Sequence, residues 1–410
     1  MKSFTKQLAV VSVIFTLILA AFVSCATPPK EEMAKKEAMM AEPTSATPAA
    51  ALRTALNGLL QEHVFLAADA TGAALGGRQA EFEAAAAALD GNSVDLANAN
   101  GSVYGPEAGE AFLPLWRKHI GFVVDYTVGV ATKDTAKQEK AVDDLVAYAT
   151  EFGAFVNSAS PSLPADAVAE LVKQHAITLK AVIDAQATGN FEEAYTSLRT
   201  AAGHMPMIAD AHAGAIAKQF PDKFPGSADS PAAALRSALN LLLREHVFLA
   251  AAATNAALGG RGAEFEAAAA ALDANSVAIA QANGSVYGPD AEAAFLPLWR
   301  KHIGFVVDYT VGLATKDTAK QEKAVNDLVS YASEFGAFLN SASPSLPADA
   351  VAELVKGHIL SLKDVIDAQA AGDQVKAFTA ERAAVAHMQM ISDAHAEAIV
   401  KQFPDKFAAK

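Results

Sequence analysis

The sequence almost lacks cysteine, since Cys25 is the only one among 410 residues. A single thiol rules out a disulfide framework, and it leaves no thiolate metal site, redox pair or cysteine nucleophile for a fold that begins after it. The stability of this protein must therefore come from burial of a hydrophobic core. A chain with 52% hydrophobic residues can supply such a core.

Basic residues are also in the minority. The chain has 32 Lys and Arg against 46 Asp and Glu, which gives a formal net charge of −14 at pH 7. A field of this sign repels phosphate backbones, so nucleic acid is excluded as a partner. The same field attracts cations in general, but it does not define a cation site.

Familiar catalytic signatures are missing as well. The sequence contains no Gly-rich phosphate loop, no nucleophile elbow and no His-Glu-x-x-His motif. The glycine pairs that begin at Gly76 and Gly259 follow helical segments and are typical of helix C-caps. We therefore predict that the protein is not an enzyme.

The first 25 residues have the pattern of a bacterial secretion signal. Two lysines precede an apolar run from Leu8 to Val23, and the small residue Ser24 stands directly before Cys25. The run is short for a membrane-spanning helix, and two prolines follow it closely. The stretch Phe-Val-Ser-Cys resembles the lipobox of bacterial lipoproteins, although Phe22 stands where leucine is usual. The resemblance implies a lipidated Cys25 and a membrane as a partner of this anchor.

Residues 1–25 are thus expected to be a lipoprotein signal peptide that ends at the lipidated cysteine. Residues 26–49 are expected to be a flexible tether, because they mix both charges with alanine and proline. The expected location is extracytoplasmic, at a bacterial membrane. Ordinary signal cleavage without lipidation is the alternative.

An internal repeat dominates the rest of the chain. The segment LRTALNGLLQEHVFLAADATGAALGGR from Leu52 returns as LRSALNLLLREHVFLAAAATNAALGGR from Leu235, and the 183-residue offset holds without a gap to the shared ending KQFPDKF. The copies agree at roughly three positions in four. We expect one repeat at residues 50–224, a short linker at 225–231 and a second repeat at 232–410, with a core in each repeat.

The pattern within a repeat is helical throughout. Ala, Leu, Glu and Lys dominate, and apolar residues recur at spacings of three and four. The prediction is an all-α fold of two tandem helical bundles with about six helices each. In the first repeat the expected helices span residues 50–75, 80–99, 106–132, 135–158, 165–188 and 191–220. The stretches NGSVYGP from Asn100 and SPSLP from Ser160 are expected to be loops.

Ten histidines are divided equally between the repeats, at equivalent positions. They are His63, His119, His175, His204 and His212 in the first repeat, and His246, His302, His358, His387 and His395 in the second. On the expected third helix His119 shares an apolar stripe with Trp116 and Val123, and His63 lies on a similar stripe of the first helix. The last helix diverges most between the copies, yet both keep His-Met-x-Met and a second histidine eight positions after the first.

Inward histidines on several helices are typical of metal and cofactor sites in bundles. Imidazole together with thioether favours copper, whereas zinc has no use for methionine and a di-iron site needs Glu-x-x-His pairs, which are absent. Met207 is preferred to Met205 as a ligand because it lies three residues from His204, and Asp125 and Asp210 are candidate outer-shell partners. The predicted ligands are His63, His119, His175, His204, Met207 and His212, and, in the second repeat, His246, His302, His358, His387, Met390 and His395.

The favoured hypothesis is copper binding inside each bundle for storage, buffering or delivery. Two other interpretations stay open. The histidines can be core residues of a structural or adhesive envelope lipoprotein that binds another envelope protein. Haem is the third possibility, and it would be held noncovalently because the sequence has no Cys-x-x-Cys-His motif.

Several stretches carry a resemblance to a known group of proteins, among them LWRKHIGFVVDYTVGVATKD and HMPMIADAHAGAIAKQFPDKF. They resemble a helical domain, often in tandem, of secreted bacterial proteins that are grouped with copper amine oxidases through a separate small β-domain. The resemblance covers nearly all of both repeats and implies an extracytoplasmic helical module. It does not imply oxidase activity, because the sequence shows neither that β-domain nor the catalytic domain whose tyrosine becomes the quinone cofactor.

Overall fold

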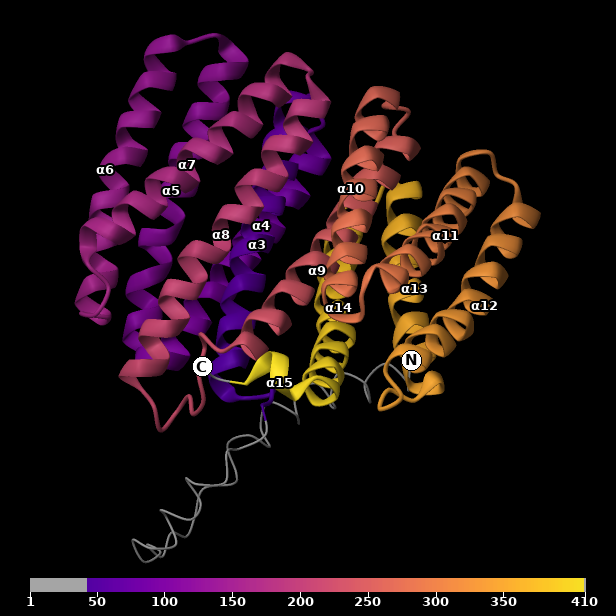
Figure 1. Ribbon diagram of the computed structural model, residues 1–410. Helices are drawn as coiled ribbons and strands as arrows, with labels where there is room; N and C mark the ends of the chain where they lie inside the picture. The colour runs from indigo at the N-terminus through magenta and orange to yellow at the C-terminus, as the bar shows by residue number, and fades with distance from the viewer. Residues whose placement is uncertain (1–42, 409–410) are drawn as a thin grey trace, which may run out of the picture. The chain divides into compact units, whose positions relative to one another are not determined.

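The computed structural model describes residues 43–408, and within that range the chain is entirely helical apart from short connections (Figure 1). The all-α prediction is confirmed. The first repeat has six helices, α3 (Pro48–Leu75), α4 (Gln79–Tyr104), α5 (Pro106–Thr132), α6 (Thr135–Ala159), α7 (Ala165–Thr188) and α8 (Phe191–Gln219). The second has α9 (Pro231–Leu258), α10 (Gly262–Tyr287), α11 (Pro289–Ala314), α12 (Thr318–Ala342), α13 (Ala348–Ala370), α14 (Gln374–Gln402) and the short α15 (Pro404–Phe407).

Some predictions lie outside the described residues, namely the signal peptide, the lipidated Cys25 and the tether up to residue 42. Residues 43–49 are described and belong to the folded unit. Ser45 donates hydrogen bonds from its backbone N–H and its hydroxyl to Glu397 on α14, at 2.8 and 2.7 Å. Within residues 43–408 no helix has the length and apolar character that crossing a bilayer requires.

The helices begin and end where local chemistry favours it. Thr47 caps α3 by accepting a hydrogen bond from the N–H of Ala50, and its counterpart Ser230 caps α9 in the same way. One loop prediction was wrong, because α4 continues through Asn100 to Tyr104. Gly105, with φ of 104°, ends that helix instead.

Gly101 lies inside α4 because it serves helix packing rather than a turn. It faces Gly109 on α5, where an added Cβ would lie 2.7 Å from the carbonyl oxygen of Ala97. The two glycines therefore let the backbones of α4 and α5 approach closely. The sequence alone gives the same signal for a packing glycine as for a loop glycine, which explains the error.

Each repeat is an up-and-down bundle. In the first, every helix contacts its neighbour in sequence and α8 closes the ring against α3. Helix α3 also contacts α5 and α7. Side chains from these three helices therefore meet in the middle of the bundle. The second repeat has the same contacts, with α9 in the position of α3.

The two repeats pack against each other through their first helices. Helix α3 lies against its counterpart α9, and the contact of α4 with α14 is the equivalent of the contact of α10 with α8. Phe65 stacks on Phe248, its own counterpart, with ring centroids 4.6 Å apart and planes 5° apart. This arrangement has the self-complementary form of a two-fold interface. Helices α3 and α9 are therefore buried on nearly all sides.

Charged side chains also join the repeats. Glu62 on α3 accepts a hydrogen bond from Arg382 on α14 at 2.6 Å, and the equivalent Glu245 on α9 accepts one from Arg199 on α8 at 2.8 Å. Both carboxylates are almost fully buried, and both are paired. Their pairing fixes the register of the repeats against each other.

Candidate metal centre

Three histidines of the first repeat meet in the middle of its bundle. His63 comes from α3, His119 from α5 and His175 from α7, and all three are buried. On α5 the buried residues around the histidine are Phe112, Trp116, His119, Val123 and Tyr126, and on α7 they are Val168, Val172, His175, Leu179 and Val182. Both series follow the spacing four, three, four, three. Each histidine therefore occupies a position that the helical period turns toward the core.

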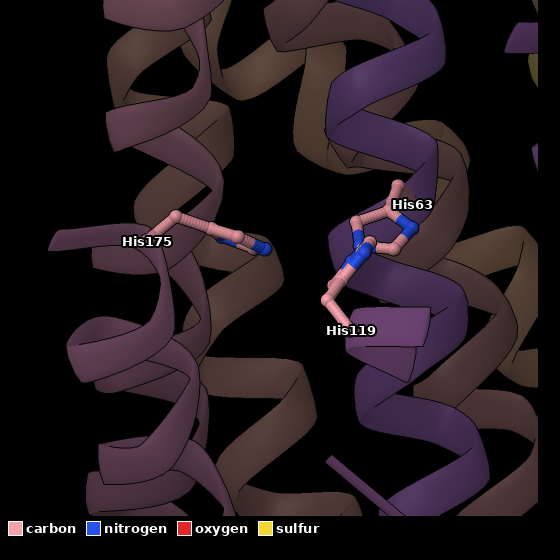
Figure 2. A group of neighbouring side chains, drawn as sticks. All are labelled: His63, His119 and His175. Atoms are coloured by element: carbon pink, nitrogen blue, oxygen red, sulfur yellow. The ribbon is translucent and has the colours of Figure 1, made fainter. Parts of the chain in front are cut away.

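The geometry of the group is that of ligands around one ion. One ring nitrogen from each histidine lies within 4.8 Å of the others, and Nε2 of His63 is 3.3 Å from Nε2 of His119. Figure 2 shows these two rings side by side, with His175 pointing toward them from the facing helix. Two nitrogens bound at about 2.0 Å to one tetrahedral ion lie about 3.3 Å apart. The His63–His119 pair thus has the spacing that a shared ion requires.

The second repeat builds the same group. His246, His302 and His358 are buried with ring nitrogens within 4.8 Å of one another, and the closest pair is again 3.3 Å apart. The ring centroids of His246 lie 5.2 Å from His302 and 5.6 Å from His358, the same distances as in the first repeat. We call these two groups the triads. Each triad could hold a metal ion.

Burial keeps the triad imidazoles neutral. It lowers the pKa of His119 to about 3 and that of His175 to about 4, and the pKa of His63 lies well below its usual value. Repulsion between the clustered rings lowers the pKa of His63 and His119 further. A neutral imidazole has a free lone pair, so the protonation state that a metal needs is already present at neutral pH.

The hydrogen-bonding capacity of the triad is not met by the protein. Nδ1 of His63 and of His175 is buried without a hydrogen-bond partner, and the same holds for His246 and His358. A buried polar group left without a partner costs roughly 1–3 kcal/mol. A cluster of such groups in both repeats therefore destabilises the fold, and packing does not account for it.

Aromatic side chains enclose the triad. The Trp116 ring lies 4.6 Å from the His119 ring, and Tyr148 on α6 stacks on His119 at 5.1 Å. The indole N–H of Trp116 and the hydroxyl of Tyr148 are also buried without partners. No carboxylate belongs to either triad among the described residues. The site therefore offers only neutral nitrogen ligands in an apolar surrounding.

The last helix does not complete the triad as the sequence analysis predicted. Nε2 of His204 hydrogen-bonds the carbonyl of Leu171 at 2.9 Å, and Nδ1 of His212 hydrogen-bonds the carbonyl of Ile208 at 2.9 Å. The Met207 side chain is 57% exposed, so it points away from the buried rings. The choice of Met207 as an inward ligand was wrong.

In the second repeat, the last helix likewise does not complete the triad. Nε2 of His387 hydrogen-bonds the carbonyl of Leu354 at 2.8 Å, and Met390 is 51% exposed. His395 is buried outside the triad, and burial lowers its pKa to about 4. Of the twelve predicted ligands, only the three histidines that form each triad come together.

Met205 is the inward methionine that the sequence analysis passed over. It is 1% exposed and lines a small apolar cavity of about 90 Å³ together with His119 and His175. The available signal was its spacing of three and four from Ile208 and Ala209, which are both buried. Distance from His204 was a poor guide, because Nε2 of His204 is engaged with the carbonyl of Leu171.

The carboxylates considered as outer-shell partners serve other contacts. Asp210 accepts hydrogen bonds from Arg53 and Asn57, both at 2.7 Å, and Asp125 pairs with Lys137 at the surface. Glu62 directly precedes His63 in the sequence, but its carboxylate pairs with Arg382 of the other repeat. None of the three hydrogen-bonds a triad histidine.

Comparison of the chain with models of protein families, with curated proteins and with solved structures finds no match. The resemblance to the tandem helical domain described above thus stays a prediction. The function of this protein has to be argued from the two triads.

Proposed function

We propose that the protein binds one copper ion in each triad and serves as an extracytoplasmic, lipid-anchored copper store, buffer or donor. The observation that carries the proposal is the duplicated group of three buried, neutral imidazoles, with one ring nitrogen from each lying within 4.8 Å of the other two. An ion at the centre of the group would be coordinated by the lone pairs of these converging nitrogens.

The ligand set favours copper over other metals. A neutral all-nitrogen site binds divalent first-row ions in the order that peaks at copper. Without a carboxylate in the triad, the ion brings its whole charge into an apolar surrounding, and a monovalent Cu(I) is desolvated at a smaller cost than a divalent ion. Zinc is the main competitor, because three histidines and one open position also suit it.

Haem fits the triad less well than a single ion. Two histidines on opposite sides of one haem iron would hold their nitrogens about 4 Å apart, with each bond about 2.0 Å long. The pair here is 3.3 Å apart, and Trp116 and Tyr148 pack directly on His119. The geometry therefore supports an ion rather than a macrocycle.

The test is a titration of the purified protein with Cu(I), Cu(II) and Zn(II) under competition with a chelator of known affinity. We expect two copper ions per chain, and one after His175→Ala. The matched control is His204→Ala, which removes a histidine of the same repeat that does not belong to the triad and should leave two ions bound. Loss of an ion from the control, or two ions in the His175→Ala protein, would falsify the proposal.

A further inference from the structure

A second cavity reaches each triad from the side of the bundle. In the first repeat it lies between α3, α4 and α5, and His63 and His119 form its inner end. At its outer end are the exposed side chains of Val124 and Val128 and the ion pair of Asp90 with Arg117. We call it the lateral cavity. Its volume is about 240 Å³ in the first repeat and about 390 Å³ in the second.

The walls of the lateral cavity are the same in both repeats. Every residue that lines it in the first repeat has an identical counterpart 183 positions on, which lines it in the second. The copies otherwise agree at roughly three positions in four. The exposed Val124, Val128 and Arg117 belong to a stretch at residues 111–129, and Asp90 to one at 80–90, that are identical throughout in the second repeat. The shape and chemistry of the cavity have thus been kept as a whole.

The chemistry of the lateral cavity favours an uncharged occupant. Its walls are alanine, leucine, phenylalanine, valine and isoleucine, with two threonines whose hydroxyls bond within the protein. Arg117 donates two hydrogen bonds to Asp90, at 2.6 and 2.8 Å, so the pair at the opening neutralises itself. A charged molecule would lose its hydration here without gaining a counter-charge.

The inner end adds a polar group. The imidazole of His63 is 1% exposed, and its Nδ1 has no hydrogen-bond partner. A cavity of about 150 Å³ with apolar walls accepts a molecule the size of benzene. The lateral cavity therefore has room for one or two aromatic rings or an equivalent aliphatic body.

We propose that each lateral cavity binds a small uncharged molecule that has an apolar body and one polar end directed at His63 and His119, or at His246 and His302. The inference rests on the proposed function only at this polar end, because the same histidines would hold the metal. The occupant would be a co-ligand of the copper ion. The apolar walls would bind its body whether or not the ion is present.

The test uses equilibrium dialysis of the purified, chelator-treated protein against 2-naphthalenemethanol. We expect saturable binding at two sites per chain. The matched anion 2-naphthoate and the matched cation 2-naphthylmethylammonium should bind at least tenfold more weakly. Binding of either ion as tight as that of the alcohol, or no saturable binding of the alcohol, overturns the proposal.

A pair of neighbouring alanines provides the control. Ala86 lines the lateral cavity, whereas Ala87 is exposed on the same helix and does not line it. Ala86→Phe should reduce the number of sites from two to one, and Ala87→Phe should leave two. If Ala86→Phe does not fold, Ala269→Phe makes the same change in the second repeat. Two remaining sites in a folded cavity-filling variant would contradict the assignment.

The outcome separates the two proposals. Copper titration of Ala86→Phe should still give two ions per chain, since the substitution leaves both triads intact. Alcohol binding without copper binding would leave the lateral cavity as a ligand site and remove the proposed function. Copper binding without alcohol binding would leave the proposed function and remove the lateral cavity as a ligand site.

Discussion

The triads and the interface between the repeats have had opposite histories since the duplication. All six triad histidines and the walls of both lateral cavities are the same in the two copies. At the interface, by contrast, Gly58 is replaced by Leu241 and Gln61 by Arg244. The triads are separate sites that each need a complete set of ligands. The interface is one site built from both copies, so its two sides can change together.

Arg244 illustrates this joint change. Its guanidinium reaches into the first repeat, where it donates to the carbonyl of Gly58 at 3.1 Å and lies 3.4 Å from the carboxylate of Glu62. A Cβ at Gly58 would lie 3.0 Å from the guanidinium carbon. The arginine of one copy therefore depends on the glycine of the other. The duplicated chain has become a complementary pair rather than two equal halves.

The largest loss of unfolding free energy is expected from substitution of Glu62, where the two sides of the interface differ most. Glu62→Ala leaves the buried Arg244 without its carboxylate and leaves Arg382 with Asp95 alone, and breaking a buried ion pair from one side costs about 3–5 kcal/mol. Glu245→Ala is the matched control. It leaves the partly exposed Arg199 without its carboxylate and the Asn275 amide without the acceptor of a 2.6 Å hydrogen bond, and it should cost about 1–3 kcal/mol. Urea unfolding measures both, and equal losses would mean that the two sides of the interface are still equivalent.

The pH dependence of stability tests the triads themselves. The pKa of a triad histidine lies below its value in the unfolded chain, so unfolding takes up protons and the free energy of unfolding falls as the pH drops below about 6.5. The window ends near the folded pKa, which is about 4 for His175 and about 3 for His358. Each such histidine contributes about 1.4 kcal/mol per pH unit within the window.

The double variant His175→Ala/His358→Ala isolates this contribution. In metal-free protein, the slope of unfolding free energy against pH between 6 and 4.5 should be lower by about 3 kcal/mol per unit than in the parent. The slope is informative even though the substitutions leave cavities, because a cavity lowers stability equally at every pH. An unchanged slope would mean that these histidines titrate normally in the folded protein.

The smallest effect is expected at the exposed methionines. Met207→Ala should leave copper stoichiometry unchanged and shift the free energy of unfolding by less than about 0.5 kcal/mol, because the side chain is mostly in solvent. Met205→Ala in the same helix should cost about 2–5 kcal/mol, since it opens a cavity beside His119 and His175. Thermal unfolding and copper titration of the pair check both statements. Loss of a copper ion in Met207→Ala would mean that Met207 is a copper ligand, as its spacing from His204 predicts.

Much of this protein follows from its sequence by local rules. The 183-residue repeat, the all-helical fold and the inward direction of His63, His119 and His175 result from spacings that a helix of 3.6 residues per turn converts into faces. The same rules misjudged Asn100 and Gly101, because a glycine that lets two helices approach has the same local signature as one that makes a turn. Helical period identifies the face of a residue, and nothing more.

Only the tertiary structure decided which histidines meet. His204 and His212 also lie on a helix of the bundle, yet each hydrogen-bonds a backbone carbonyl, while residues from α3, α5 and α7 converge to within 4.8 Å. Such a distance depends on how far each helix is shifted along the bundle and rotated about its axis, and the close packing of all six helices sets both. The sequence determined that imidazoles enter the core; the packing of the helices determined that three of them share one centre.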